Sequence, residues 1–427
     1  SLTLTETSKS LTAGKTAVFT ANYTGTDTLN AYVQGSAVNG YFTISQKNNG
    51  DGTYTVSVKI DEETPGGMYT LFVHEPGNTS VQASATITVT GLPDAAEVNG
   101  KQYKSLPRAL DAAQDGDTVK LLADHTTNWS DVEAGEYATL AVVKKTLTLD
   151  LNLWTVDYLV VGEVVPDEAG GILESTDGNL TVVDNIQGGS HGKIKDLEFV
   201  QGSLAIQGGQ IGDSDGSGLT CDGNSGTVTI SGGTVCNVTV GDGAAVTVTG
   251  GTGHAGGWYN DGTLNITDGT FGNVRFRNNG GSIAISGGTF GTITNINGSS
   301  SIPLMPLLAD NYAFYQGDNA QNSTEKTLTN VTVRPHTHSF ENGKCDCGAS
   351  YVASVTTSNG VTNNYTSLDD ALDAAKDGDT VKLLGDAEIT KWRWLTAAIT
   401  LDLNGKTITT QSNAELYIRA QVIVQDN

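Results

Sequence analysis

The chain has 427 residues, a length that predicts two to four domains rather than one core. It contains 53 glycines but only 8 prolines and 2 methionines, which favours many short strands and tight turns over long helices. The formal charge of −24 argues against nucleic acid as a partner, because an acidic surface repels phosphate, and no stretch of sequence suggests a membrane span.

The first ninety residues predict a β-sandwich. In "DGTYTVSVKI" the residues Tyr54, Val56, Val58 and Ile60 alternate with polar residues, so they share one face of a half-buried strand. About seven such runs, separated by glycine-rich and proline-rich turns, are typical of a two-sheet sandwich. The stretch from "DGTYTVSVKI" through "TPGGMYTLFV" resembles the immunoglobulin-like modules of bacterial surface proteins. That resemblance implies a spacing or binding role.

One sentence of the sequence occurs twice. "SLPRALDAAQDGDTVKLLAD" begins at Ser105 and "SLDDALDAAKDGDTVKLLGD" at Ser367, and 16 of the 20 positions agree. In the first copy the serine can cap a helix, and a strand follows. The apolar stripe of this helix comprises Leu106, Ala109, Leu110 and Ala113. We expect each copy to be a helical cap that covers the first strand of a repeating structure.

The repeating structure is visible between residues 200 and 297. Ile230, Val248, Ile266 and Ile285 follow one another at intervals of 18, 18 and 19 residues, within segments that end in glycine pairs. This period predicts the coils of a parallel β-solenoid with stacked apolar residues inside. The region from about residue 95 onward resembles the right-handed, pectate-lyase-like β-helix modules of large Gram-positive surface proteins. That resemblance implies a fold and not an activity.

The expected fold class is therefore all-β. We predict an immunoglobulin-like β-sandwich over 1–92, a right-handed parallel β-helix with a helical N-terminal cap over 93–335, and a His/Cys linker hairpin over 336–350. Residues 351–427 would form the capping helix and first coils of a second, truncated β-helix. Because the second copy stops after few coils, we expect the chain to be a piece of a longer protein.

The linker "HTHSFENGKCDCGA" contains a candidate metal site. An Asn342-Gly343 turn would place Phe340 opposite Cys345 and His338 opposite Cys347. The predicted ligands, a set suited to zinc, are His336, His338, Cys345 and Cys347. The segment resembles the His-x-His and Cys-x-x-Cys-Gly linkers between modules of Gram-positive surface proteins, but here the spacing is Cys-x-Cys. The alternative is a polar linker with solvent-facing thiols.

The solenoid also carries a candidate ligand site. Arg275 and Arg277 should point outward, and they are the only arginines between residues 125 and 333. Subtracting one coil of 18 residues puts Tyr259 beneath Arg277 and the core residue Trp258 beneath Phe276. We predict an acidic-ligand site formed by Tyr259, Arg275 and Arg277. The alternative is that the arginines offset nearby acids or stack on Tyr259.

Other chemically suggestive residues have structural interpretations. In "GDSDGSG" a calcium loop is less favoured than a solvated corner, and the residues concerned are Asp213, Asp215, Ser217 and Asp222. Cys221 and Cys236 fall out of register, which favours two buried thiols over a disulfide bond. Asp369 and Asp370 suit the first turn of a helix.

We therefore predict no catalytic residue. The favoured function is a non-enzymatic, monomeric adhesin or ligand-binding module, secreted or associated with a bacterial cell wall. Its partner would be a host glycoprotein, a host protein or a polysaccharide. One alternative is an enzyme that acts on polysaccharide or glycan at the solenoid flank, and another is a purely structural stalk.

Overall fold

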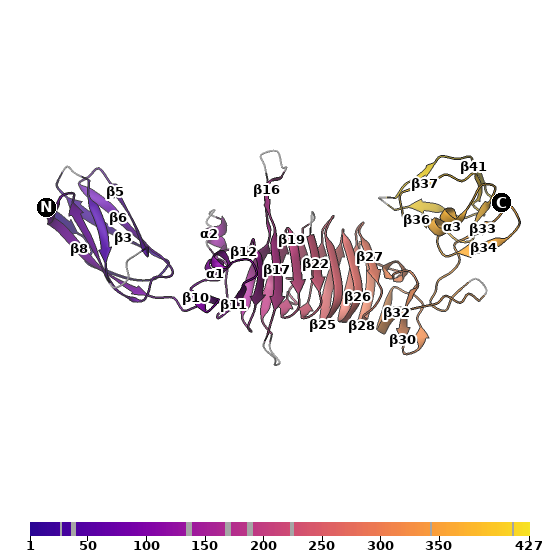
Figure 1. Cartoon of the computed structure of the whole chain (residues 1–427), viewed down its shortest axis with the longest axis horizontal. Coiled ribbons are helices and arrows are strands. Elements are labelled where there is room, and N and C mark those ends of the chain that lie inside the picture. Colours follow the sequence, from indigo (N-terminus) through magenta and orange to yellow (C-terminus); the bar gives the residue numbers. More distant parts are fainter. Residues whose placement is uncertain are drawn as a thin grey trace. The chain divides into compact units, whose positions relative to one another are not determined.

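The computed structural model describes residues 1–25, 28–35, 40–133, 139–166, 172–185, 191–222, 226–341, 344–411 and 414–427. The chain divides into two compact units, Ser1–Ala141 and Val142–Asn427. Strands dominate both units, which confirms the all-β prediction (Figure 1).

The first unit begins with a β-sandwich of two four-stranded sheets. One sheet has the order β1 (Leu2–Leu4), β3 (Thr16–Tyr23), β6 (Thr53–Ile60), β5 (Phe42–Asn48). The other has the order β2 (Ser8–Thr12), β8 (Asn78–Thr90), β7 (Gly67–Glu75), β4 (Asn30–Gln34). The predicted face of β6 is confirmed, because Tyr54, Val56, Val58 and Ile60 are all buried in the core between the sheets.

The first repeated sentence folds as a helix beside short strands. Helix α1 (Leu106–Ala112) follows Ser105, whose side chain accepts a hydrogen bond of 3.4 Å from the backbone N–H of Arg108. The buried face of α1 packs against β9, β10 and β11, as its apolar stripe predicts. The elements of this segment are β9 (Ala96–Val98), β10 (Lys101–Tyr103), β11 (Thr118–Leu121), α2 (Trp129–Glu133) and β12 (Ala141–Val143), which ends in the second unit.

The second unit is a right-handed parallel β-solenoid (Figure 1). The register confirms the predicted stack, since Ile230 pairs with Val248, Val248 with Ile266, and Ile266 with Ile285. Along one face lie β13 (Thr146–Asp150), β17 (Gly178–Val183), β19 (Gly202–Ile206), β22 (Gly226–Ile230), the starts of β25 (Ala245–Asn260) and β26 (Thr263–Asn278), and β27 (Ser282–Ile285).

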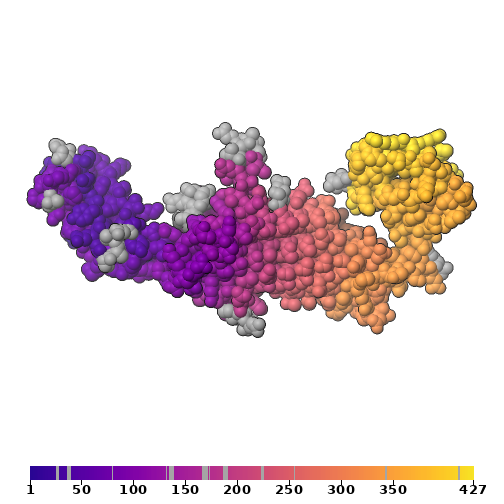
Figure 2. Space-filling view, viewed as in Figure 1, coloured from indigo at the N-terminus to yellow at the C-terminus, as the bar shows by residue number. Residues whose placement is uncertain are grey.

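The remaining strands of each coil build the other faces. They are β14 (Thr155–Val161), β18 (Lys193–Phe199), β20 (Gln210–Ile211), β21 (Leu219–Cys221), β23 (Thr234–Val235), β24 (Val238–Val240) and β28 (Thr289–Asn297). The coils follow one another in residue order, and β15 (Glu163–Pro166) with β16 (Ile172–Thr176) projects from them (Figure 2).

Antiparallel strands cover the last coil of this solenoid. β28 pairs with β32 (Thr327–Pro335), which in turn pairs with β30 (Tyr312–Gln316). The shorter elements here are β29 (Ser300–Ile302), the 3₁₀ helix η1 (Met305–Leu307) and β31 (Asn319–Ala320). We call this segment, residues 300–335, the solenoid cap. It removes an open strand edge that would otherwise pair with other chains.

The second repeated sentence folds like the first. Helix α3 (Leu368–Ala374) is capped by Ser367 and packs on β33 (Ala353–Thr356), β34 (Thr362–Tyr365), β35 (Thr380–Leu383) and β36 (Ala387–Ile389). Parallel coils continue through β37 (Arg393–Leu395), β38 (Ile399–Asp402), β39 (Ile408–Thr410), β40 (Leu416–Ile418) and β41 (Val422–Gln425).

The helix-dipole interpretation of Asp369 is incomplete. Asp370 does belong to the helix cap, because its carboxylate accepts a hydrogen bond from the Ser367 hydroxyl. Asp369, however, is buried, and its carboxylate lies 3.1 Å from the guanidinium of the buried Arg393. Burial without this partner would be costly, so the ion pair and not the dipole explains the acid at this position.

Candidate functional site

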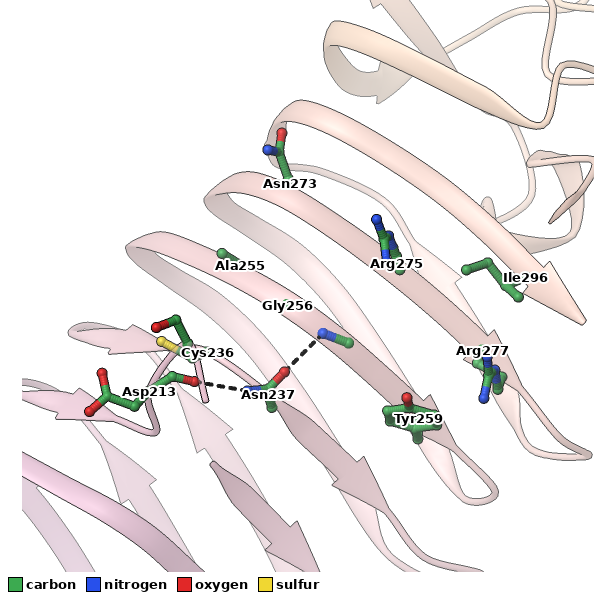
Figure 3. A pocket seen from close by; sticks show the side chains of 12 residues that line it. Asp213, Cys236, Asn237, Ala255, Gly256, Tyr259, Asn273, Arg275, Arg277 and Ile296 are labelled. Atoms are coloured by element: carbon green, nitrogen blue, oxygen red, sulfur yellow. Dashed lines mark hydrogen bonds between the residues drawn. The ribbon is translucent and has the colours of Figure 1, made fainter. Parts of the chain in front are cut away.

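The three residues of the predicted ligand site line one cavity of about 520 Å³ on the solenoid. Arg275 and Arg277 lie two residues apart on β26, and Tyr259 lies on the neighbouring strand β25 (Figure 3). We call this the arginine cavity. Its wall also contains Asn237 and Asn273, so hydrogen-bonding groups surround the two guanidinium groups.

The register beneath the cavity is the predicted one. Tyr259 pairs with Arg277, and Trp258 pairs with Phe276. Trp258 is fully buried and makes edge contacts with Phe271 and Phe276, with ring centroids 5.8 and 5.9 Å away. Trp258 is therefore a core residue that anchors the strand, while the alternating Tyr259 faces outward.

The arginines retain free hydrogen-bonding capacity. Among the described residues neither Arg275 nor Arg277 makes an ion pair, although the protein has a formal charge of −24. The Arg277 guanidinium lies 5.1 Å from the centroid of the Tyr259 ring, and its buried Nε has no hydrogen-bond partner. Stacking is thus present, but the alternative in which the arginines neutralise adjacent carboxylates is not what the described residues show.

Neighbouring polar groups hold the rim of the cavity. The Asn237 amide donates to the backbone carbonyls of Asp213 and Ser217 at 3.1 and 3.0 Å, and its oxygen accepts from the Gly257 N–H at 3.0 Å (Figure 3). The carboxylate of Asp213 is paired with Lys193 at 2.8 Å. The one acid on this rim is therefore already neutralised.

The corner "GDSDGSG" is held by its own hydrogen bonds. The Asp215 carboxylate accepts from the hydroxyl and the N–H of Ser217 at 2.7 and 3.1 Å, and these bonds lower its pKa. Asp213 is occupied by Lys193, as described above. This arrangement suits the solvated corner favoured from the sequence.

The two cysteines of the solenoid are free thiols. Cys221 is buried and pairs with Val240, four residues away from Cys236, so the two thiols are out of register. Burial raises the pKa of Cys221 to about 12. The prediction that both are buried is wrong for Cys236, which is half-buried because it lies on the wall of the arginine cavity.

The structure brings the four predicted metal ligands of the linker together. One ligand atom from each of them lies within 4.8 Å of all the others. The His336 Nε2 is 3.1 Å from the Cys345 Sγ, and the His338 Nδ1 is 3.3 Å from the Cys347 Sγ. We call these four residues the His/Cys cluster. Within the described part of the chain it is the one group of three or more His, Cys, Asp or Glu residues with this geometry.

The predicted hairpin is correct at its start and wrong beyond it. Glu341 and Lys344 pair across the turn, whose residues 342–343 lie outside the described residues. Cys345 does not continue opposite Phe340, because its carbonyl accepts from the Gly348 N–H at 3.0 Å and its N–H donates to Ala349. Gly348 adopts φ +89°, which glycine tolerates readily, and the chain turns back at once. The predicted flat face is therefore replaced by a tight turn.

This turn buries both thiols, so the alternative of solvent-facing thiols is wrong. Cys345 and Cys347 pack in a small cluster that includes Ala313 of the solenoid cap. Burial raises the pKa of the Cys347 thiol to about 11, and burial with the nearby His336 lowers the pKa of His338. The set faces protein rather than water.

The sequence analysis missed an aromatic cluster on the second set of coils. Trp394 and Tyr417 are neighbours in the parallel pair β37–β40, with ring centroids 4.7 Å apart, and Trp392 lies 5.2 Å from Trp394. The Arg419 guanidinium lies 3.4 Å from the centroid of the Trp394 ring. All three rings are exposed. The signal was present in "KWRWL" and "LYIR", which alternate around inward Leu395.

The comparisons leave the family open. No family model and no curated protein matches this chain. The fold itself defines the class: an all-β protein built on a right-handed parallel β-solenoid, an architecture found in pectate-lyase-like and adhesin-type proteins. Within the described residues, no helix combines the length and apolar character that crossing a membrane requires.

Proposed function

We propose that this protein is a non-enzymatic ligand-binding module that holds the carboxylate of an acidic glycan in the arginine cavity. The observation that carries the proposal is the pair of guanidinium groups in the cavity wall, neither of which makes an ion pair among the described residues. A guanidinium fork matches the geometry of a carboxylate, and two forks on one strand lie about 7 Å apart. One acidic sugar spans that distance.

The surroundings favour a sugar over a densely charged polymer. The protein's charge of −24 repels polyanions, whereas a single carboxylate on an otherwise neutral chain can reach the two arginines. Tyr259 offers an exposed ring beside Arg277 against which a sugar ring can pack. A glycoprotein glycan and a free polysaccharide share this chemistry.

The cellular setting belongs to the same proposal. We place the protein outside a bacterial cell, secreted or attached to a Gram-positive wall, with an immunoglobulin-like module at 1–92 and a β-helix at 93–335. The linker at 336–350 would then separate it from a second β-helix at 351–427. The support is the repeated helix-and-strand sentence, which heads a run of parallel coils at both places.

An enzyme is the second candidate, because one small cavity of about 150 Å³ combines acid groups with a tyrosine. Asp196 and Glu198 lie on β18, and the Tyr158 hydroxyl donates to the Glu198 carboxylate. Burial and this carboxylate raise the pKa of Tyr158. A lyase or hydrolase could use such a set for proton transfer. Turnover of an acidic polysaccharide that Glu198→Gln abolishes would favour the enzyme.

The arginine cavity gives the first test. We expect the double variant Arg275→Ala/Arg277→Ala to keep its melting temperature and to lose about 2 to 4 kcal/mol of binding free energy for acidic glycans, because both charged hydrogen-bonding groups are removed. Binding is measured by calorimetry at moderate salt with uronic-acid and sialic-acid oligosaccharides found on a glycan array.

Two variants control this measurement. Lys195→Ala removes an exposed cation from the same solenoid and should leave affinity unchanged. Arg275→Lys/Arg277→Lys keeps the charge but loses the planar forks, so its affinity should fall between those of wild type and the alanine variant. Unchanged affinity in the double alanine variant contradicts the proposal, and binding only to proteins on a parallel array would replace the glycan by a protein partner.

The aromatic cluster supports glycan binding by a different contact. Exposed tryptophan and tyrosine rings pack against sugar rings, and the neighbouring Arg419 and Glu415 offer polar groups for hydroxyls. We expect Trp394→Ala to reduce polysaccharide retention in affinity electrophoresis by about tenfold, equivalent to about 1.4 kcal/mol. Trp154→Ala is the matched control, because Trp154 and Trp394 are both 39% exposed. Equal retention of the two variants would count against this contact.

A further inference from the structure

We propose that the His/Cys cluster is a structural zinc site that fastens the linker onto the solenoid cap. Zinc in proteins takes four ligands in a tetrahedron, with Zn–N near 2.0–2.1 Å and Zn–S near 2.3 Å, so neighbouring ligand atoms lie roughly 3.3 to 3.8 Å apart. The two measured His–Cys contacts, 3.1 and 3.3 Å, and the limit of 4.8 Å for the whole set are close to these separations.

The donor set selects the metal. Two thiolates with two imidazoles form one of the standard structural zinc sets, and thiolates disfavour calcium and magnesium, which prefer oxygen. His336, Cys345 and Cys347 are buried, and His338 is half-buried. With four protein ligands and little solvent access, the site is of the closed kind that stabilises structure rather than the open kind that activates water.

A tyrosine outside the ligand set orients one of the histidines. The Tyr315 hydroxyl lies 2.7 Å from the His336 Nδ1, which leaves Nε2 directed at Cys345. Tyr315 is itself held beneath Arg334, whose guanidinium lies 4.1 Å from the centroid of its ring. Groups that fix the second nitrogen of a ligating histidine are a general feature of zinc sites. Tyr315 is therefore a positioning residue of the metal site.

The ligands come from segments that the fold alone joins only weakly. His336 directly follows β32 of the solenoid cap, whereas Cys345 and Cys347 belong to the tight turn. The turn reaches the cap through one backbone hydrogen bond, from the Ser323 N–H to the Cys347 carbonyl at 2.8 Å, and through a small apolar cluster. A zinc ion bound by all four residues would add a strong cross-link at this point.

Metal analysis of the whole chain tests the site. After reduction, loading with zinc and exhaustive dialysis, we expect about one equivalent of zinc per chain by mass spectrometry of the metal. Cys347→Ser should lower the content below about a tenth of an equivalent, whereas Cys236→Ser, a free half-buried thiol elsewhere, should leave it unchanged. Cobalt substitution should give the absorption of a tetrahedral site with two thiolates.

Two further measurements separate a metal site from a packing effect. Tyr315→Phe, which keeps the ring, should weaken zinc binding by about 10- to 100-fold in competition with a chelator. A chelator should speed proteolysis within residues 336–350 of the wild type and have no effect on Cys347→Ser, with circular dichroism confirming that both are folded. Zinc below a tenth of an equivalent in the wild type, zinc unchanged by Cys347→Ser, or a Cys345–Cys347 disulfide in reduced protein would overturn the proposal.

Discussion

Leu110→Asp is expected to lower the free energy of unfolding of the first unit by about 3 kcal/mol or more. Leu110 is 3% exposed and lies on the face of α1 that packs against β9, β10 and β11. An aspartate there must either bury a carboxylate among apolar groups or withdraw the helix from the strands. Both outcomes uncover apolar surface and promote aggregation.

Ala112→Asp is the matched control for this variant. Ala112 is exposed two positions along the same helix, so it introduces the same charge and costs about 0.3 to 1 kcal/mol through the helix dipole. Because a chain with several domains need not unfold in one step, hydrogen exchange should be followed in residues 93–125 alongside urea unfolding. Equal exchange rates in the two variants would show that the stripe contributes little.

Arg393→Ala is expected to destabilise the second set of coils by about 3 to 5 kcal/mol. The Arg393 guanidinium lies 3.1 Å from the Asp369 carboxylate and 3.0 Å from that of Asp373, and it donates to the Asp369 carbonyl at 2.7 Å. Asp369 is 3% exposed, so removing the arginine leaves a buried carboxylate without its counter-charge. Its hydrogen bonds from the Thr390 N–H and hydroxyl remain but do not neutralise it.

A double-mutant cycle decides whether the buried pair is responsible. Asp369→Asn combined with Arg393→Ala should be less destabilised than the sum of the two single variants, because the uncompensated charge is gone. Arg419→Ala removes an exposed arginine from the same coils and should cost only about 0.5 to 1 kcal/mol, the value of an exposed cation–π contact. If the effects of Asp369→Asn and Arg393→Ala simply add, the ion pair is not the cause.

The cores of this protein could be predicted from the sequence alone. Tyr54 and Val56 alternate at period two, Leu106 and Leu110 recur at helical spacing, and Ile266 recurs once per coil, so each pattern states which face is buried. The constant coil length also placed Tyr259 beside Arg277, because parallel neighbours in a solenoid are separated by a nearly fixed number of residues.

Other features depended on the tertiary structure. Burial of Cys345 and Cys347 follows from a tight turn at Gly348 and from packing on Ala313, neither of which a residue pattern expresses. The partner of Asp369 is Arg393, 24 residues away, and its identity depends on how α3 sits on the coil that follows. Periodicity reports which side of an element is apolar, whereas contacts between polar side chains depend on the path of each turn and on neighbours distant in sequence. For this reason the solenoid and the residues of both sites were predictable, and the burial and the partners of their side chains were decided only by the fold.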